Sequence, residues 1–256
     1  MKKFLSVLGA TALLCSNALA EHEMSTLKVG TEALFAPFNF SEGENRGHHE
    51  DLKGFDIDII RAIAKEIGYE VEFVVLNFDE LIPAVITEQI DLVISALTIT
   101  SERAKLVDFS DPYFNSGLAI LVKLSLADSI NSTEDLANRT VCVSSGTTAS
   151  EYAQNLKDSF VVELGSEKDA FIGLNKGECD TVISDRPNIE YFLKTFKDPK
   201  AKLLSEKITV DQYGIITAKH HHDLADKIQK GLHIIQKNGT YDKIYMKWFG
   251  NRSENN

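Results

Sequence analysis

Hydrophobic and polar positions alternate between a strand-like period of two and a helical period along the first half of this chain. Residues 27–31 (LKVGT) and 70–76 (EVEFVVL) carry apolar side chains at every second position, which is typical of strands. Between them, isoleucines at 59, 60, 63 and 67 recur at helical spacing and stop at Gly68. A second helical pattern follows at 81–86, and then an apolar run at 91–97 (DLVISAL). Such alternation predicts parallel sheets covered by helices.

The same rhythm returns in the second half. It predicts strands at 117–123, 140–144, 161–164 and 180–184, with helices at 147–157, around 171–176, and from Pro187 onward. Residues 210–218 (VDQYGIITA) indicate one more strand, and a long helix then ends at Asn238-Gly239 before a last helix. No proline-rich or low-complexity linker divides the chain, so strands should connect any two lobes.

Residues 1–20 indicate a secretory signal peptide. Lys2 and Lys3 precede an apolar run, and Ala18-Leu19-Ala20 is typical of a cleavage site. We therefore expect cleavage after Ala20 and export without a lipid anchor. The chain carries 38 acidic and 27 basic residues, a net charge of −11, which argues against nucleic-acid binding. No later apolar stretch is long enough to predict membrane insertion.

Other chemistry is sparse. Cys142 and Cys179 could pair after export, but both border strand-like runs where buried free thiols are common, so we favour unpaired thiols. The runs His48-His49 and His220-His221-His222 lie beside charged residues and favour solvated loops over a metal site. Neither a G-x-S-x-G elbow nor a P-loop occurs, and we predict no cofactor, metal or catalytic residue.

Polar and aromatic residues gather just after the predicted strands, where ligands bind in open α/β sheets. Arg103 matches a carboxylate as a two-pronged donor, and the helix start at 145–148 (SGTT) offers N–H groups to the same anion. Asp185 would pair with an ammonium, and Phe35 and Phe78 could hold a side chain between their faces. Together these groups describe a free amino acid.

Each of these residues also has a simpler interpretation. Arg103 could be an exposed helix charge, Asp185 and the 145–148 turn could only cap helices, and Phe35 and Phe78 could belong to the core.

Several segments resemble the polar amino-acid-binding proteins of bacterial ABC importers, periplasmic solute-binding proteins. The resemblance runs from about Leu27 to Gly250 and rests on VGTEALFAPFNF, LKGFDIDIIRAIAKEIG, FDELIPAV, ALTITSERAKLVDFSDPYF, VSSGTT, SDRPNIEYFLKT and NGTYDKIYMKWFG. It implies the two-lobed type II periplasmic binding-protein fold, an α/β fold in which each lobe is a mainly parallel sheet with flanking helices. Lobe 1 would comprise 27–114 plus 214–250, lobe 2 would comprise 115–213, and two hinge strands would join them.

The resemblance also implies ten ligand-binding residues in a cleft that closes on the ligand. They are Glu32, Phe35, Phe78, Ala96, Thr98, Arg103, Ser144, Thr147, Thr148 and Asp185. Arg103 would hold the α-carboxylate, with Thr147 and Thr148 completing that site from lobe 2. Thr98 and the Ala96 backbone would help hold the α-groups, and Asp185 would hold the α-ammonium. The two phenylalanines would sandwich the ligand side chain, whose far end would meet Glu32.

Departures from the glutamine binders favour a basic ligand. Ser144 stands where they carry a lysine, Ser184 where they carry a histidine, and Glu32 replaces their aspartate. A carboxylate in a closing cleft is costly to bury unless a cation arrives with the ligand. We therefore expect a monomeric periplasmic protein that delivers arginine, lysine or ornithine to a membrane permease. The alternatives are a polar neutral ligand such as glutamine, or a periplasmic dehydratase with Glu32 as its general acid.

Overall fold

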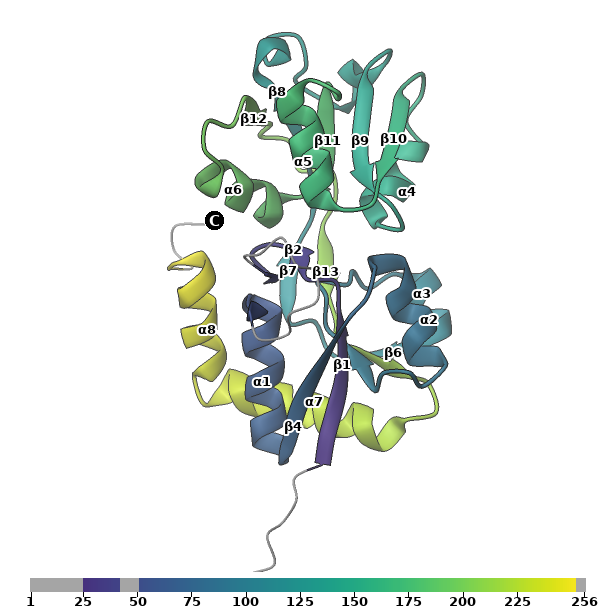
Figure 1. Ribbon diagram of the computed structural model, residues 1–256, viewed down its shortest axis with the longest axis vertical. Coiled ribbons are helices and arrows are strands. Elements are labelled where there is room, and N and C mark those ends of the chain that lie inside the picture. Colours follow the sequence, from purple (N-terminus) through teal and green to yellow (C-terminus); the bar gives the residue numbers. More distant parts are fainter. Residues whose placement is uncertain (1–24, 42–50, 252–256) are drawn as a thin grey trace, which may run out of the picture.

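The computed structural model describes residues 25–41 and 51–251, so the predicted signal peptide and His48-His49 lie outside the described residues. Two separate five-stranded sheets, one above the other in Figure 1, form the body of the molecule. Helices cover both faces of each sheet, which confirms the predicted two-lobed α/β fold. We call the part built on the first sheet lobe 1 and the part built on the second lobe 2.

The lobe 1 sheet has the strand order β4-β1-β5-β14-β6. Its strands are β1 (Ser25–Thr31), β4 (Tyr69–Val75), β5 (Leu92–Val93), β6 (Val107–Phe109) and β14 (Ile216–Ala218), beside a small hairpin of β2 (Leu34–Phe35) and β3 (Asn39–Phe40). β1 pairs in parallel with β4 and β5, whereas β14 runs antiparallel to β5 and β6. A strand from the far end of the chain thus completes the first sheet.

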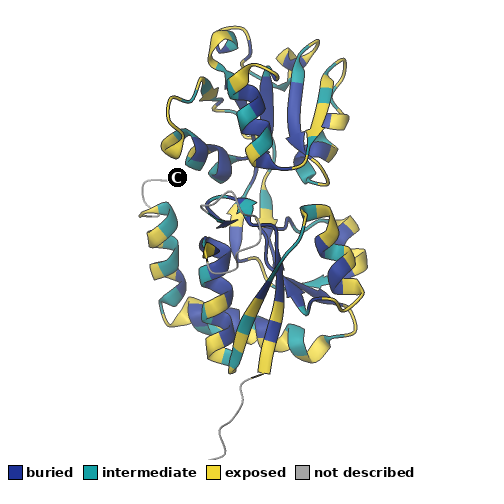
Figure 2. Ribbon diagram, in the orientation of Figure 1, coloured by how far each residue is buried: buried dark blue, intermediate teal, exposed yellow. Residues whose placement is uncertain are grey.

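The lobe 2 sheet repeats this plan in the order β10-β9-β11-β8-β12. Its strands are β8 (Leu118–Lys123), β9 (Thr140–Ser144), β10 (Phe160–Leu164), β11 (Thr181–Asp185) and β12 (Ala201–Leu203). β9 is parallel to β10 and β11, and β8 is the antiparallel strand. Figure 2 shows the central strands buried, while the edge strand β10 carries exposed positions such as Phe160.

The chain passes between the sheets twice. One passage is β7 (Phe114–Ser116) and the other is β13 (Asp211–Tyr213), and the two pair antiparallel between the lobes (Figure 1). The predicted single strand at 210–218 is therefore wrong, because Gly214 and Ile215 separate β13 from β14 and the two strands join different sheets. The proposed lobe boundaries beside these strands stay a prediction.

Helices with one apolar face cover the sheets. In lobe 1 they are α1 (Phe55–Ile67), α2 (Leu81–Ile86), α3 (Ser101–Leu106), α7 (His222–Lys237) and α8 (Thr240–Phe249), with the short 3-10 helix η2 (Phe78–Glu80). In lobe 2 they are α4 (Thr148–Gln154), α5 (Glu167–Lys176) and α6 (Arg186–Thr195), with 3-10 helices η3 (Leu124–Leu126) and η4 (Thr133–Leu136). Gly68, in the left-handed region at φ 78°, ends α1 as its sequence predicts.

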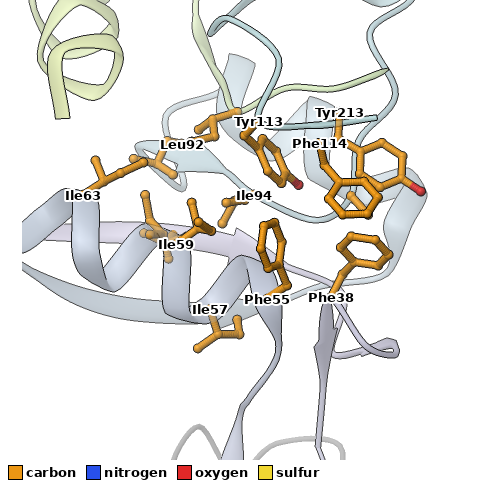
Figure 3. Packing of buried hydrophobic residues seen from close by; sticks show 14 of the residues in the cluster. Phe38, Phe55, Ile57, Ile59, Ile63, Leu92, Ile94, Tyr113, Phe114 and Tyr213 are labelled. Carbon is orange, nitrogen blue, oxygen red and sulfur yellow. The ribbon is translucent and has the colours of Figure 1, made fainter. Parts of the chain in front are cut away.

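An aromatic cluster joins lobe 1 to the two passages. Phe38, Phe55, Tyr113, Phe114 and Tyr213 pack together with isoleucines of α1, as Figure 3 shows. Phe38 is fully buried and meets Phe114 and Tyr213 edge to face, with ring centroids 4.9 and 5.2 Å apart. Both crossing strands are thereby packed against the core of lobe 1.

Two further predictions need correction. The apolar run 91–97 forms only the two-residue strand β5, because Ala96 turns into the left-handed region at φ 46° and ends the extended chain. Cys142 and Cys179 are not free thiols, since they form a disulfide whose Cα atoms lie 5.9 Å apart. That bond links β9 to the residues just before β11, so it joins two neighbouring parallel strands.

Candidate ligand-binding site

All ten residues that the sequence singles out surround one cavity between the lobes. Its lining consists of Glu32, Phe35, Phe78, Ser95, Ala96, Thr98, Arg103, Ser144, Thr147, Thr148, Glu167 and Asp185. The cavity has a volume of only about 20 Å³. Because one water needs about 10–15 Å³, the walls stand close together.

Strand ends and helix starts supply this lining. In lobe 1, Glu32 follows β1, Phe78 begins η2, and Ala96 and Thr98 follow β5. In lobe 2, Ser144 ends β9, Thr148 begins α4, Glu167 begins α5 and Asp185 ends β11. The carboxyl ends of the parallel strands of both sheets thus meet at the cavity, which is the expected location for a ligand in open α/β sheets.

Arg103 is buried and is not the exposed helix charge of the simpler interpretation. Its side chain is 8 % exposed, Nη1 donates to the Thr98 carbonyl at 3.0 Å, and Nη2 donates to the Gly146 carbonyl at 3.2 Å. Its guanidinium carbon lies 5.5 Å from the centre of the Phe78 ring. Burial lowers the pKa of Arg103, but an arginine stays cationic at any physiological pH. Two carbonyls use only part of its five N–H donors, so donors remain for an anion.

Asp185 occupies the position just before α6, yet its side chain makes no hydrogen bond that caps the helix. Instead its Oδ1 accepts a hydrogen bond from the Ser116 hydroxyl at 2.8 Å, and Ser116 in turn accepts one from Tyr213 at 2.9 Å. Burial raises the pKa of Asp185 to about 6, against the opposing effect of the Tyr213 and Ser116 hydrogen bonds. A cation beside this carboxylate would offset its desolvation.

Glu167 belongs to the cavity wall although the sequence analysis did not select it. It is 3 % exposed, and within the described part of the chain its Oε2 has no hydrogen-bond partner. Burial raises the pKa of Glu167 well above its usual range, with Asp185 and Glu32 adding to the shift and Ser184 opposing it. The residue follows β10. The rule that ligand-binding residues lie just after the strands, here called the strand-end rule, would therefore have selected Glu167 if applied to the strand predicted at 161–164.

Asp56 shapes the cavity without lining it. This fully buried residue of α1 accepts hydrogen bonds from the Ala96 N–H at 2.7 Å, the Tyr113 hydroxyl at 2.8 Å and the Asn39 amide at 3.0 Å. Burial raises the pKa of Asp56 to about 6, and these hydrogen bonds oppose the rise. Because Asp56 holds the Ala96 N–H, it fixes the left-handed turn that carries the chain from β5 into the cavity wall.

The remaining predicted residues have less specific surroundings. Phe35 lies in the lobe 1 core as well as at the cavity, and its ring stacks on Phe38 with centroids 5.8 Å apart. The Thr147 hydroxyl donates to the Ser144 carbonyl at 2.7 Å and accepts the Ser150 N–H at 3.2 Å, so it caps α4. The backbone of Glu32 is held by the Ser95 hydroxyl at 3.1 Å.

Hydrogen bonds join the two lobes at two places. The Arg103–Gly146 hydrogen bond crosses from lobe 1 to lobe 2. The Asn188 amide of α6 donates to the Ala36 carbonyl of lobe 1 at 2.5 Å. Gly146 has φ 73°, and a Cβ placed there would lie 3.3 Å from the Asp79 side chain. The cavity is therefore closed over by contacts between the lobes.

Comparison with known proteins shows which family shares this arrangement of two sheets and a cavity between them. Residues 27–251 match the family of bacterial extracellular solute-binding proteins, family 3. The chain belongs to this family. Among its relatives is ABC transporter arginine-binding protein 1 of Escherichia coli strain K12, which is 32 % identical over 244 residues, 93 % of this chain and 96 % of that protein.

Solved structures of amino-acid-binding proteins have the same fold. An ancestral arginine-binding protein bound to arginine has a TM-score of 0.83 and 42 % identity, and covers 90 % of this chain and all of that one. An ancestral arginine-binding protein bound to glutamine has a TM-score of 0.82, with the same identity and coverage. Within residues 25–41 and 51–251, helices of the length and apolarity needed to cross a bilayer are absent.

Proposed function

We propose that this protein captures a free basic L-amino acid, arginine above all, by closure of its two lobes, and delivers it to the membrane permease of an ABC transporter. We further propose that it acts in the periplasm as a monomer after removal of residues 1–20, and that it binds its ligand without transforming it. The names of its relatives and the lining of the inter-lobe cavity support this proposal.

The α-groups of the ligand would bind at opposite walls. Arg103 would hold the α-carboxylate with the donors that its two carbonyl partners leave available. The hydroxyl of Thr147 is already used within α4, so Thr147 and Thr148 would contribute backbone N–H groups of the helix start. Asp185 would hold the α-ammonium, which would make its ionised form favourable in the cavity.

The observation that carries the choice of a basic ligand is the buried Glu167 carboxyl. Its Oε2 lacks a partner among the described residues, and leaving such a group unsatisfied costs about 1–3 kcal/mol or more. A guanidinium or ammonium at the end of the ligand side chain would supply both hydrogen bonds and the opposite charge. Glu32, on the facing wall, would contribute a second carboxylate to the same region.

Calorimetry with arginine, lysine, ornithine and glutamine tests the proposal. We expect arginine to bind more tightly than glutamine, and Glu167→Gln to weaken arginine at least about 30-fold, because a buried charge pair is lost. Glu178→Gln serves as the matched control, since Glu178 is exposed just beyond α5 and should leave affinity unaltered. Tighter binding of glutamine would overturn the basic ligand alone, whereas no binding of any amino acid would overturn the proposal.

A second candidate is a dehydratase on the same fold. Glu167 favours it specifically, because a buried carboxyl in the cavity wall whose pKa is raised could serve as a general acid. Incubation with prephenate or arogenate distinguishes the two functions. Turnover that Glu167→Gln abolishes would establish the enzyme, and absence of turnover with tight arginine binding would support the receptor.

A further inference from the structure

A cluster of metal-ligating side chains lies on the surface of lobe 1. It consists of Glu88, in the turn after α2, and of His220 and His221, in the turn between β14 and α7. Their nearest ligand atoms all lie within 4.8 Å of one another. None of these residues lines the inter-lobe cavity.

We propose that Glu88, His220 and His221 bind a divalent transition-metal ion of the zinc type. Two imidazoles and one carboxylate, with a fourth position left to water or another ligand, form a donor set that suits Zn²⁺ in proteins. Imidazole ligands select zinc, nickel or copper, whereas Mg²⁺ and Ca²⁺ prefer oxygen atoms alone. The cluster should therefore prefer a borderline ion such as Zn²⁺ over a hard ion such as Mg²⁺ or Ca²⁺.

The distances between donors suit such an ion after small rotations. Nε2 of His220 lies 2.6 Å from Oε1 of Glu88, and Nε2 of His221 lies 4.0 Å from the same oxygen. Ligands about 2.0–2.1 Å from a tetrahedral metal stand about 3.3 Å apart, which falls between these two values. The side chains of Glu88 and His220 are more than half exposed, so both can rotate freely enough to reach this spacing.

Backbone hydrogen bonds hold the two turns that carry Glu88, His220 and His221, so these side chains lie close together before any metal binds. Glu88 has φ 59°, and the next residue, Gln89, donates its N–H to the Ala84 carbonyl of α2 at 3.0 Å. The His221 carbonyl accepts N–H groups from Leu224 and Ala225 in the first turn of α7. A metal ion would bind ligands that the fold holds close together, with little ordering of the chain.

The neighbouring basic side chains, Lys219 and His222, lie beside another carboxylate rather than beside Glu88. Lys219 lies 3.4 Å and His222 lies 3.8 Å from carboxylate oxygens of Asp108 instead. Local spacing in the sequence could not reveal the site, because Glu88 and His220 are 132 residues apart along the chain. The histidine run, predicted to be a solvated loop, thus gains a third ligand only in the folded protein.

Titration calorimetry with ZnCl₂ alone, on the full chain treated with a chelator and without amino acid, tests the site. We expect one Zn²⁺ per chain at this site, and at least about tenfold weaker binding in Glu88→Gln and in His220→Ala, since even outer ligand partners contribute that much. His233→Ala is the matched control. His233 is also half exposed and also meets a carboxylate, Asp111 at 3.0 Å, but among the described residues it belongs to no such cluster.

A second readout separates this site from the rest of the histidines. Co²⁺ bound in a tetrahedral site should give visible absorption that His220→Ala abolishes and His233→Ala retains. Zinc binding that persists unchanged in a His220→Ala/His221→Ala variant would overturn the proposal, as would absence of binding in the unaltered protein. Circular dichroism of each variant verifies that these surface changes leave the fold intact.

Discussion

Each lobe buries one aspartate whose pKa burial raises to about 6, yet the two surroundings differ. Asp56 in lobe 1 accepts three hydrogen bonds from a backbone N–H, a tyrosine and an asparagine, and lies away from the cavity surface. Asp185 in lobe 2 is held by hydroxyl groups on the crossing strands and lines the cavity. A raised pKa alone therefore does not identify a ligand-binding group. What distinguishes Asp185 is that it lines the cavity and that fewer protein donors already occupy its carboxylate.

The largest effect should come from removing the aspartate with three donors. Asp56→Ala is expected to lower the free energy of unfolding by about 3–5 kcal/mol, because three buried donors lose their acceptor. Urea unfolding followed by circular dichroism measures this. Asp185→Ala should change the same quantity by less than about 1 kcal/mol, since its hydroxyl partners can turn to water in the cavity. Equal losses in both variants would erase the distinction between the two sites.

Arg103 is the positive counterpart of Asp185 across the cavity. Arg103→Ala should weaken every amino-acid ligand at least about 30-fold, because a buried charge-assisted pair with the α-carboxylate disappears. Calorimetry gives the affinities. Lys105→Ala, in the same helix but exposed beside Glu102, should leave them unchanged. Near-native affinity in Arg103→Ala would mean that the buried guanidinium serves the contact between lobes alone.

The pH dependence of ligand binding should reveal the titration of Asp185. A ligand ammonium would lower the pKa of Asp185 from about 6, so binding releases a proton near that pH. Affinity for glutamine should be constant above pH 7 and should fall by up to about tenfold for each unit below 6. Arginine affinity should depend on pH more steeply than glutamine affinity, because Glu167, whose pKa burial raises, also ionises on binding.

Variants identify the group responsible for each part of this profile. Asp185→Asn should flatten the acidic part, and Glu167→Gln should remove the part unique to arginine. A profile that is flat from pH 5 to 8 in the unaltered protein would contradict the assignment of Asp185 to the ammonium.

The smallest effect concerns the contact between lobes. Asn188→Ala removes the hydrogen bond to the Ala36 carbonyl and should weaken arginine about fivefold, since one hydrogen bond contributes about 1 kcal/mol. X-ray scattering with and without arginine should show a smaller radius of gyration in the bound form of both proteins. Unchanged affinity in the variant would show that this contact does not favour the closed arrangement.

The strand-end rule reached the cavity because parallel strands bring their carboxyl ends to one edge of a sheet. It works from local pattern alone, and residues as far apart as Glu32 and Asp185 were selected in this way. Glu167 was not selected because the rule was not applied to the strand predicted at 161–164, after which this residue lies. The apolar pattern gave no help there, since it starts near Phe171, whereas α5 begins four residues earlier with a polar first turn.

Contacts between residues far apart along the chain could not be predicted from the sequence for a different reason. Asp56 stood in the recognised G-F-D segment, but its donors Ala96 and Tyr113 lie 40 and 57 residues away. Likewise, the pairing of Cys142 with Cys179 depends on two strands lying side by side, which composition cannot show. An alanine in the left-handed region, as at Ala96, is equally invisible because that residue type does not favour it.

The late strand β14 has a consequence for how the chain reaches this structure. The lobe 2 strands all lie within residues 118–203, so that lobe can form from one continuous stretch. The lobe 1 sheet must wait for residues 216–218, and contacts between distant segments form slowly because a long loop has to close first. Until β14 pairs with it, β5 keeps an unpaired edge, so we expect lobe 1 to complete its sheet only after lobe 2 has formed.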